Sequence, residues 1–186
     1  DGIQDPDETP LENVTVRLFA ADGTMLAELA REYRSYVRIG EIPEVVVQAF
    51  LATEDRRFFH HEGLDIRGLA RAAVANFRSG TVVQGGSTIT QQVAKKRLSA
   101  DRTLDRKIRE ALLSIRLETQ LSKHEILEIY LNEIFLGHGA HGVSAAAGRY
   151  FGKRLEELSL AEAALIAGLA RAPSRYNPVR DPDRAR

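Results

Sequence analysis

Apolar side chains recur at helical spacing along most of the chain after Pro43. In the stretch IPEVVVQAFLATED, Val46, Phe50 and Leu51 fall on one helical face. Pro43 stands where a helix begins, a position that proline favours. The stretch DIRGLARAAVANFRSG repeats the pattern and closes on Gly80, as helix C-termini often do. The spacing therefore predicts two consecutive amphipathic helices.

Four further helical segments follow. The stretch ADRTLDRKIREALLSIRLETQ predicts an amphipathic helix with an apolar stripe made of Leu104, Ile108, Leu112 and Ile115. Two later helices begin with capping boxes, which pair a serine with a glutamate three residues on, at Ser122–Glu125 and Ser159–Glu162. We expect the first to run to Gly137 and the second to stop at Pro173. Between them, GVSAAAGRYFG predicts a short Ala-rich helix that ends on Gly152.

The N-terminal part follows a different pattern. Residues 1–13 are acidic and rich in turn formers, which indicates a loose lead-in. Val14, Val16 and Leu18 then alternate with polar residues, and the pair Asp22 and Gly23 is a turn signal. We expect a short β-hairpin here, so the sequence predicts an all-α domain with a small β appendage.

Composition narrows the class of protein. The chain has 186 residues, enough for one domain with a single core. Apolar residues make up 44% and charged residues 28%, as in soluble globular proteins. Basic and acidic residues number 26 each, so the chain lacks the basic excess of nucleic-acid-binding proteins, and the absence of cysteine excludes disulfides and thiolate metal sites. No run of 18 apolar residues occurs.

Glu54 and Asp55 stand where helix stability alone would not place them. They end an apolar helix, where carboxylates oppose the helix dipole, and Phe58, Phe59 and His61 follow closely. A carboxyl group beside aromatic side chains has its charged form disfavoured and can accept a proton near neutral pH. The alternative is an ordinary surface turn in which the next two residues, both arginines, serve as counter-ions.

A polar segment leads into a basic region. The stretch QGGSTITQQVAKK predicts a hydroxyl- and amide-rich loop ahead of Lys95 and Lys96. On the following helix, Arg106 and Lys107 share one face with Glu110. Residues 84–118 contain eight bases and four acids, which suits a phosphate or pyrophosphate group. The alternative is a solvated face of ion pairs.

Metal and nucleotide motifs are weak. HEILE at residues 124–128 is not a zinc-binding HExxH motif, because Glu128 occupies the second ligand position. His138 and His141 flank glycines but lack a third ligand. The glycine pairs match no P-loop or dinucleotide fingerprint.

Taken together, five ordered stretches resemble the motifs of family 51 peptidoglycan glycosyltransferases. They read ATEDRRFFHHEGLD, GGSTITQQVAKK, RKIREALLSIRLE, ILEIYLNEIFLGHGAHGVSAAAGRYFGK and RAPSRYNP, and the resemblance covers about Val14 to Pro178. The opening FAADGTMLAEL is similar to the start of the class A penicillin-binding proteins within that family.

The resemblance implies a lysozyme-like helical fold with a membrane-dipping jaw subdomain. It also implies polymerisation of lipid II into β-1,4 glycan strands by inverting transfer, with release of undecaprenyl pyrophosphate. Glu54 would be the general base and Glu110 the second essential carboxylate, with Glu128 and Asn132 supporting the cleft from behind. The matching substrate-binding positions are Asp55, Phe58, His61, Gly63, Gly86, Ser87, Thr88, Thr90, Gln91, Gln92, Lys95, Arg106, Lys107 and Arg116.

The resemblance also sets expectations for context. Residues 1–13 would follow a membrane anchor, residues 14–178 would form the glycosyltransferase domain, and residues 179–186 would begin a linker to a transpeptidase domain. No serine has lysine three positions later and no KTG triad occurs, so this chain lacks the penicillin-reactive site. The resemblance also implies that the protein works at the extracytoplasmic face of the bacterial inner membrane, anchored there in its full-length form.

Expected partners are lipid II, the growing glycan strand, the membrane surface, that transpeptidase domain and other cell-wall synthesis proteins, with no nucleic acid. The inhibitor moenomycin would bind the same site. A divalent cation, Mg²⁺ or Mn²⁺, could sit at Glu110 through the pyrophosphate, and no organic cofactor is expected. The stretch Ala75–Gly86 is expected to rest on lipid, because Phe77, Val82 and Val83 lie beside Arg78 and three glycines.

Two other functions compete with this one. A glycan hydrolase of lysozyme-like architecture would need no basic pyrophosphate site, so the basic cluster after Gln92 argues against it. A non-catalytic module that binds anionic lipid or glycan would keep its affinity after substitution of Glu54 and would have no activity to lose.

Overall fold

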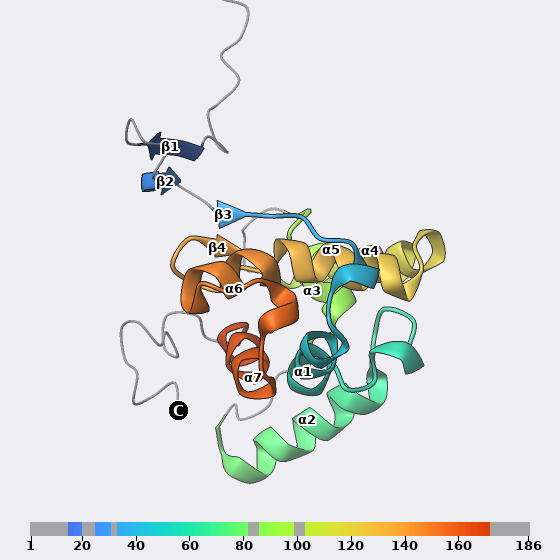
Figure 1. Cartoon of the computed structure of the whole chain (residues 1–186). Helices are drawn as coiled ribbons and strands as arrows, with labels where there is room; N and C mark the ends of the chain where they lie inside the picture. Colours follow the sequence, from blue (N-terminus) through green and yellow to red (C-terminus); the bar gives the residue numbers. More distant parts are fainter. Residues whose placement is uncertain (1–14, 20–24, 31–32, 82–85, 99–102, 172–186) are drawn as a thin grey trace, which may run out of the picture.

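The computed structural model describes residues 15–19, 25–30, 33–81, 86–98 and 103–171, and the prediction of a mainly helical domain is confirmed there (Figure 1). Three short 3-10 helices also occur, one of them at Phe58–His60 (η2). The α-helices are α1 (Glu44–Glu54), α2 (Ile66–Ser79), α3 (Ile89–Lys95), α4 (Leu104–Gln120), α5 (Lys123–Glu133), α6 (Val143–Phe151) and α7 (Leu160–Leu169).

The core lies around α1 and α7, which pack alongside each other at the centre of the molecule (Figure 1). The sequence of α7, LAEAALIAGL, is apolar on nearly all sides, so this helix suits a buried position. Phe50 of α1 meets Tyr130 of α5 edge to face, with ring centroids 6.1 Å apart. These contacts give Glu54, at the end of α1, a rigid support.

The strands lie in the N-terminal part and in one loop. Strands β1 (Thr15–Phe19) and β2 (Met25–Ala30) pair antiparallel, while the turn expected at Asp22 and Gly23 lies outside the described residues. Strand β3 (Tyr33–Arg34) pairs in parallel with β4 (Ala140–His141), which joins the N-terminal segment to the loop before α6. The expected domain boundaries at residues 13 and 178 also lie outside the described residues.

Two side chains of α5 hold the segment that leads into α1. Glu128 Oε2 accepts a hydrogen bond from the amide of Ile39 at 2.6 Å. Asn132 forms two bonds with Val37, accepting from its amide and donating to its carbonyl, both at 2.8 Å. Both side chains are thus engaged on the N-terminal segment, as architectural support of the cleft would require.

The predicted end of α5 at Gly137 is wrong, because the helix ends four residues earlier, at Glu133. The chain then turns back on itself. The amide of Leu136 donates to the carbonyl of Ala140 at 3.0 Å, and Gly142 donates to Ile134 at 2.8 Å. The turn needs left-handed backbone at Gly137, His138 and Gly139, which a continuing helix would not allow. The helix predicted to stop at Pro173 likewise ends earlier, at Leu169.

The amphipathic stripe of α4 faces outward rather than into the core. Its four members are between 44% and 78% exposed: Leu104, Ile108, Leu112 and Ile115. The buried positions of this helix are polar instead, Glu110 and Ser114. The stripe predicted from the sequence is thus an exposed face of α4, and the fully buried side chains of the helix are a carboxylate and a hydroxyl.

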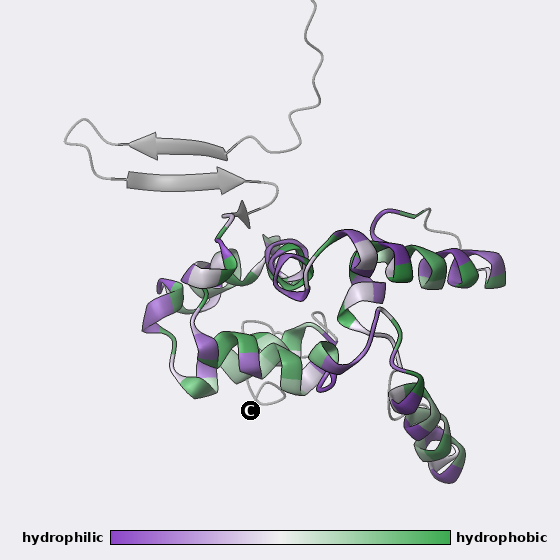
Figure 2. Ribbon diagram, turned by 90° about the vertical axis from the view of Figure 1, so that its right-hand side faces the viewer, coloured by the Kyte–Doolittle hydropathy of each residue, from purple (hydrophilic) through white to green (hydrophobic). Residues whose placement is uncertain are grey.

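Helix α2 exposes apolar residues in the same way. Ile66 is 66% exposed and Phe77 is 90% exposed, while Ala72 is its buried position. The helix is the lowest in both views, and Figure 2 shows hydrophobic and hydrophilic residues mixed along its surface. Among the described residues, no helix is both long enough and apolar enough to cross a membrane. Val82 and Val83, expected to contact lipid, lie outside the described residues.

Candidate functional site

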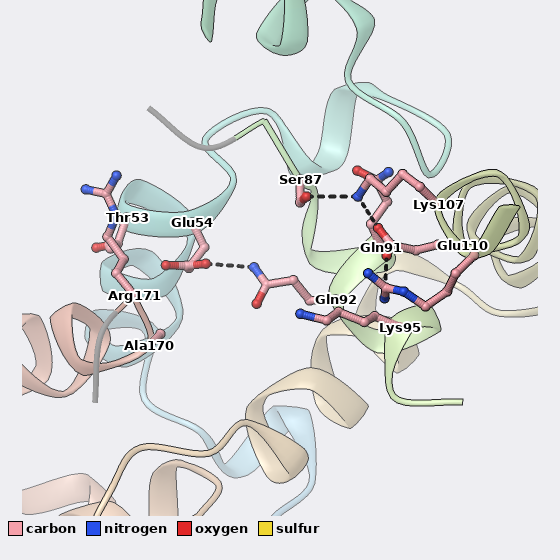
Figure 3. A pocket seen from close by; sticks show the side chains of 11 residues that line it. Thr53, Glu54, Ser87, Gln91, Gln92, Lys95, Lys107, Glu110, Ala170 and Arg171 are labelled. Atoms are coloured by element: carbon pink, nitrogen blue, oxygen red, sulfur yellow. Dashed lines mark hydrogen bonds and ion pairs between the residues drawn. The ribbon is translucent and has the colours of Figure 1, made fainter. Parts of the chain in front are cut away.

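A cleft of about 360 Å³ opens where the ends of four helices meet (Figure 3). Helix α1 supplies one wall, α3 and α4 supply the opposite wall, and the turn after α7 closes one end. The side chains that line it are Thr53, Glu54, Ser87, Gln91, Gln92, Lys95, Arg106, Lys107, Glu110, Ala170 and Arg171. Eight of these eleven were predicted as site residues from the sequence.

Glu54 is the acidic group on the α1 wall. It is the last residue of the helix, and its Oε2 accepts a hydrogen bond from Gln92 Nε2 at 2.7 Å across the cleft. Burial raises the pKa of Glu54 above its ordinary value, although the Gln92 bond and the charge of Arg171 oppose the shift. Glu54 can therefore accept a proton at a higher pH than an exposed glutamate.

Asp55 does not lie in a surface turn. Its carboxylate is buried, 7% exposed, and contacts His61 Nε2 at 3.0 Å. It also accepts the amide of Ile89, the first residue of α3, at 3.0 Å. The alternative with neighbouring arginines as counter-ions is wrong, because Arg57 pairs with Asp65 and Arg56 binds a backbone carbonyl. Asp55 and His61 thus join α1 to α3, behind Glu54.

The polar segment predicted as a loop is the start of a helix. Thr88 accepts from the amide of Gln91 at 3.1 Å, and the side chain of Gln91 accepts from the amide of Thr88 at 3.0 Å. This is a capping box, a pattern readable in the sequence as Thr-x-x-Gln. It begins α3 at Ile89 and leaves Gln92 and Lys95 directed at the cleft, as Figure 3 shows.

Several predicted binding residues have structural contacts instead of cleft positions. Thr90 is fully buried and donates to Glu118 at 2.6 Å, and Phe58 is 1% exposed. Thr88 donates to the carbonyl of Gly63 at 2.6 Å. Gly63 has a positive φ, and a Cβ added there would lie 2.9 Å from the backbone of Ser114 on α4. These residues fix how α3 and α4 approach each other.

The α4 wall carries the charges. Glu110 is 2% exposed, ion-paired with Lys107 and 3.6 Å from Arg106 Nη1. Lys107 also donates to Ser87 Oγ at 3.2 Å. The alternative of a solvated ion-pair face is wrong, because the carboxylate that pairs with both cations is buried. Arg116, by contrast, is exposed and does not line the cleft.

A protein ligand set for a divalent cation is missing from the described residues, which contain no group of three or more histidine or acidic side chains able to hold one. The Glu110 carboxylate is committed to Arg106 and Lys107. The described residues therefore do not fit a resident ion by themselves. The expected cation at Glu110 stays a prediction.

Two further cavities adjoin the cleft. The larger one, of about 770 Å³, extends from the cleft to α2. The residues that it shares with the cleft are Thr53, Glu54, Ser87 and Arg171. Its other lining residues include Gly68, Arg71 and Ala75 on α2, and Gly86. The other, of about 480 Å³, shares Gln92, Lys95 and Arg106 and reaches the end of α5. Glu54 therefore stands between a large chamber on one side and the cationic wall on the other. Such an arrangement can deprotonate a hydroxyl group while stabilising an anionic leaving group.

Arg171 was missed by the sequence analysis. It follows α7, lines both the cleft and the large chamber, and lowers the pKa of Glu54 by its charge. Its signal in the sequence is a cation at the first position of the stretch RAPSRYNP, which closes the domain.

Comparison with known proteins agrees with these observations. The family model described as Transglycosylase matches residues 22–186. Penicillin-binding protein 1A of Aquifex aeolicus is 52% identical over 185 residues, covering 97% of this chain and 26% of that protein. The protein of the same name from Escherichia coli K12 is 49% identical, and the match covers 97% of this chain and 22% of that protein. The one from Neisseria gonorrhoeae is also 49% identical, and the match covers 91% of this chain and 21% of that protein.

A crystal structure of penicillin-binding protein 1A from Haemophilus influenzae, determined at 2.6 Å resolution, is 27% identical. The structural match covers 93% of this chain and 16% of the Haemophilus influenzae chain, with a TM-score of 0.49. The chain thus spans about a quarter or less of the length of these relatives.

The protonation of Glu54 gives a direct test of the site. A ¹³C NMR titration of its carboxyl group should give a pKa above the ordinary 4.5. Gln92→Ala should raise the pKa further, because it removes a donor that stabilises the charged form. Since the folded-state pKa is raised, this group stabilises the fold most at low pH, and that contribution is lost as the pH rises through the folded pKa. Gln48→Ala, which removes an exposed amide bound to Glu44, is the control. A Glu54 pKa at or below 4.5 would contradict this account.

Proposed function

Because the chain belongs to the transglycosylase family and is a peptidoglycan glycosyltransferase domain, we propose that it polymerises lipid II into β-1,4 glycan strands. The transfer inverts the anomeric centre and releases undecaprenyl pyrophosphate. The observation that carries this proposal is the placement of Glu54 on one wall of a cleft whose opposite wall holds Lys95 and Lys107 (Figure 3). Arg106 also lines this cleft.

Glu54 acts as the general base. The acceptor sugar hydroxyl attacks the anomeric carbon of the donor as its proton passes to the Glu54 carboxylate. A base is most effective when its pKa lies near the working pH, and burial moves the pKa of Glu54 in that direction. The hydrogen bond from Gln92 fixes the orientation of the carboxylate.

The cationic wall stabilises the leaving group. As the new glycosidic bond forms, the bond between the anomeric carbon and the pyrophosphate oxygen breaks, and its electron pair leaves with the pyrophosphate. Lys95, Arg106 and Lys107 place positive charge where this negative charge develops. A single displacement of this kind inverts the anomeric centre.

Glu110 has a different role from Glu54. Its carboxylate is buried and already accepts from Lys107 and pairs with Arg106. It therefore holds the two cations in place rather than taking the proton of the acceptor. The acceptor strand fits the large chamber, because that cavity and the cleft share Glu54.

The hydrolase alternative is disfavoured by the same wall. Hydrolysis of a glycan releases no pyrophosphate. A hydrolase would therefore have no use for the two cations that the buried Glu110 holds in the cleft. A non-catalytic binding module would have no need of a buried carboxyl group with a raised pKa beside those cations.

The full-length protein is proposed to be a bifunctional class A penicillin-binding protein. The match covers about a quarter of the length of these relatives, which leaves room for a transpeptidase domain and an anchor in the full-length protein. We place the domain at the extracytoplasmic face of the inner membrane, where a lipid-linked substrate is presented. The exposed apolar faces of α2 and α4 suit contact with that membrane.

Replacing the base should abolish the reaction. Glu54→Gln keeps the shape of the side chain but cannot accept the proton, so lipid II polymerisation should fall by about 100- to 10,000-fold. Product length analysis on gels measures the residual activity, and circular dichroism checks the fold. Residual polymerisation above roughly a tenth of the wild-type rate would exclude Glu54 as the base.

The two adjacent lysines should differ. Lys95 lines the cleft, whereas Lys96 binds the carbonyl of Glu133 at the end of α5. Lys95→Ala should weaken moenomycin binding by roughly 10- to 100-fold, the usual loss for a charge-assisted hydrogen bond. Lys96→Ala is the matched control and should change the affinity little. Equal losses would instead indicate a diffuse electrostatic patch.

Membrane contact can be tested on α2. The double variant Val74→Ser and Phe77→Ser removes two exposed apolar side chains, which are 51% and 90% exposed. Liposome association should fall roughly tenfold or more, because each buried side chain of this kind contributes about 1.5–3 kcal/mol. Leu160→Ser, at a 70% exposed position on α7, is the control. Normal association together with a lower melting temperature would show that these residues belong to the core.

A further inference from the structure

A second buried carboxylate on α4, that of Glu118, lies outside the cleft. Its side chain is 7% exposed, and one oxygen, Oε1, accepts two hydrogen bonds. Thr90 of α3 donates at 2.6 Å and Lys123 of α5 at 2.7 Å. Lys123 also lies over the ring of Phe58, 4.4 Å from its centroid. The carboxylate thus contacts two other helices, and through Lys123 it is linked to a third element, η2.

Three buried polar side chains of α4 are spaced four residues apart, those of Glu110, Ser114 and Glu118. Glu110 pairs with two cations of α4, and Ser114 donates to a backbone carbonyl of α4. Glu118, by contrast, accepts a hydrogen bond from Thr90 of α3. Four large apolar residues of α4 face away from these contacts, whereas Leu117 packs against the core. Apolar packing therefore holds α4 at Leu117, and the bond between Thr90 and Glu118 supplies a directional contact with α3.

The same two helices carry the cationic wall. Lys95 is on α3, five residues after Thr90, and Arg106 and Lys107 are on α4. A shift of α4 along α3 would change the spacing between these charges. A displacement of about 1 Å at a reacting centre can cost on the order of 100-fold in rate.

We infer that Glu118 is a positioning residue, which sets the register of α4 on α3 through Thr90 and so fixes the spacing of the cationic wall. This inference rests on the proposed function for the importance of that spacing, but the register itself is a property of the fold. Lys123 supplies the charge that allows the carboxylate to be buried.

Binding of inorganic pyrophosphate, measured by calorimetry, tests the effect on the cationic wall. Glu118→Gln and Thr90→Val should each weaken it about tenfold, a change of about 1.4 kcal/mol, whereas Thr90→Ser should bind like the wild type. Lys153→Ala removes an ion pair with Glu162 on a distant face and is the control for general loss of stability. If the control loses as much affinity as Glu118→Gln, or if Glu118→Gln binds normally, the inference is wrong.

Spin labels test the register independently of any activity. The chain has no cysteine, so Arg97→Cys after α3 and Leu112→Cys on α4 provide a single labelled pair. Glu118→Gln and Glu118→Ala should shift or broaden the distance distribution, and Lys153→Ala should not. An unchanged distribution in both Glu118 variants would overturn the inference. If the wild-type chain fails to polymerise lipid II, the proposed function is refuted. The spin-label distances would still test the register of α4, because they do not depend on activity.

Discussion

The whole site depends on the contact between the end of α1 and the start of α3. The Asp55 carboxylate accepts the first amide of α3 at Ile89, at a helix N-terminus, where a negative charge is favoured. His61 contacts the same carboxylate. This contact brings Gln92 within hydrogen-bonding reach of Glu54 and directs Lys95 into the cleft. Together with the bond from Gln92 to Glu54, it fixes the acidic wall relative to the cationic wall.

Burial of carboxylates is the recurring physical problem of this structure, and each one is solved differently. Asp55 is satisfied by an amide and a histidine, Glu110 by two cations, and Glu118 by a hydroxyl and a lysine. Burial disfavours the charged form of a carboxyl group that has few partners, and such a group becomes a weaker acid. Glu54 has one neutral donor and a neighbouring arginine, and burial raises its pKa. Its incomplete satisfaction is what suits it to accept a proton.

Much of the fold could be predicted from local patterns. The capping boxes at Ser122 and Ser159 and the helix ends at Gly80 and Gly152 lie where the sequence placed them, because these signals act within one turn. The box at Thr88 follows the same local rule, because Gln91 stands three residues after it, but polar residues of this kind also suit ligand binding. The orientation of α4 could not be predicted, since periodicity shows which residues share a face but not what that face meets. The distant partners of Asp55 and Thr90 are equally invisible to a local pattern.

The outward apolar stripe of α4 follows from the same chemistry. A residue on a helix can face only one direction. The side of α4 that lines the cleft carries Glu110, which holds two cations there. The four apolar residues of its stripe are then left facing away, where water would disfavour them. A lipid surface removes that penalty, because apolar side chains are not exposed to water there. The demand for charge inside the cleft and the demand for apolar surface outside it are thus met by opposite faces of one helix.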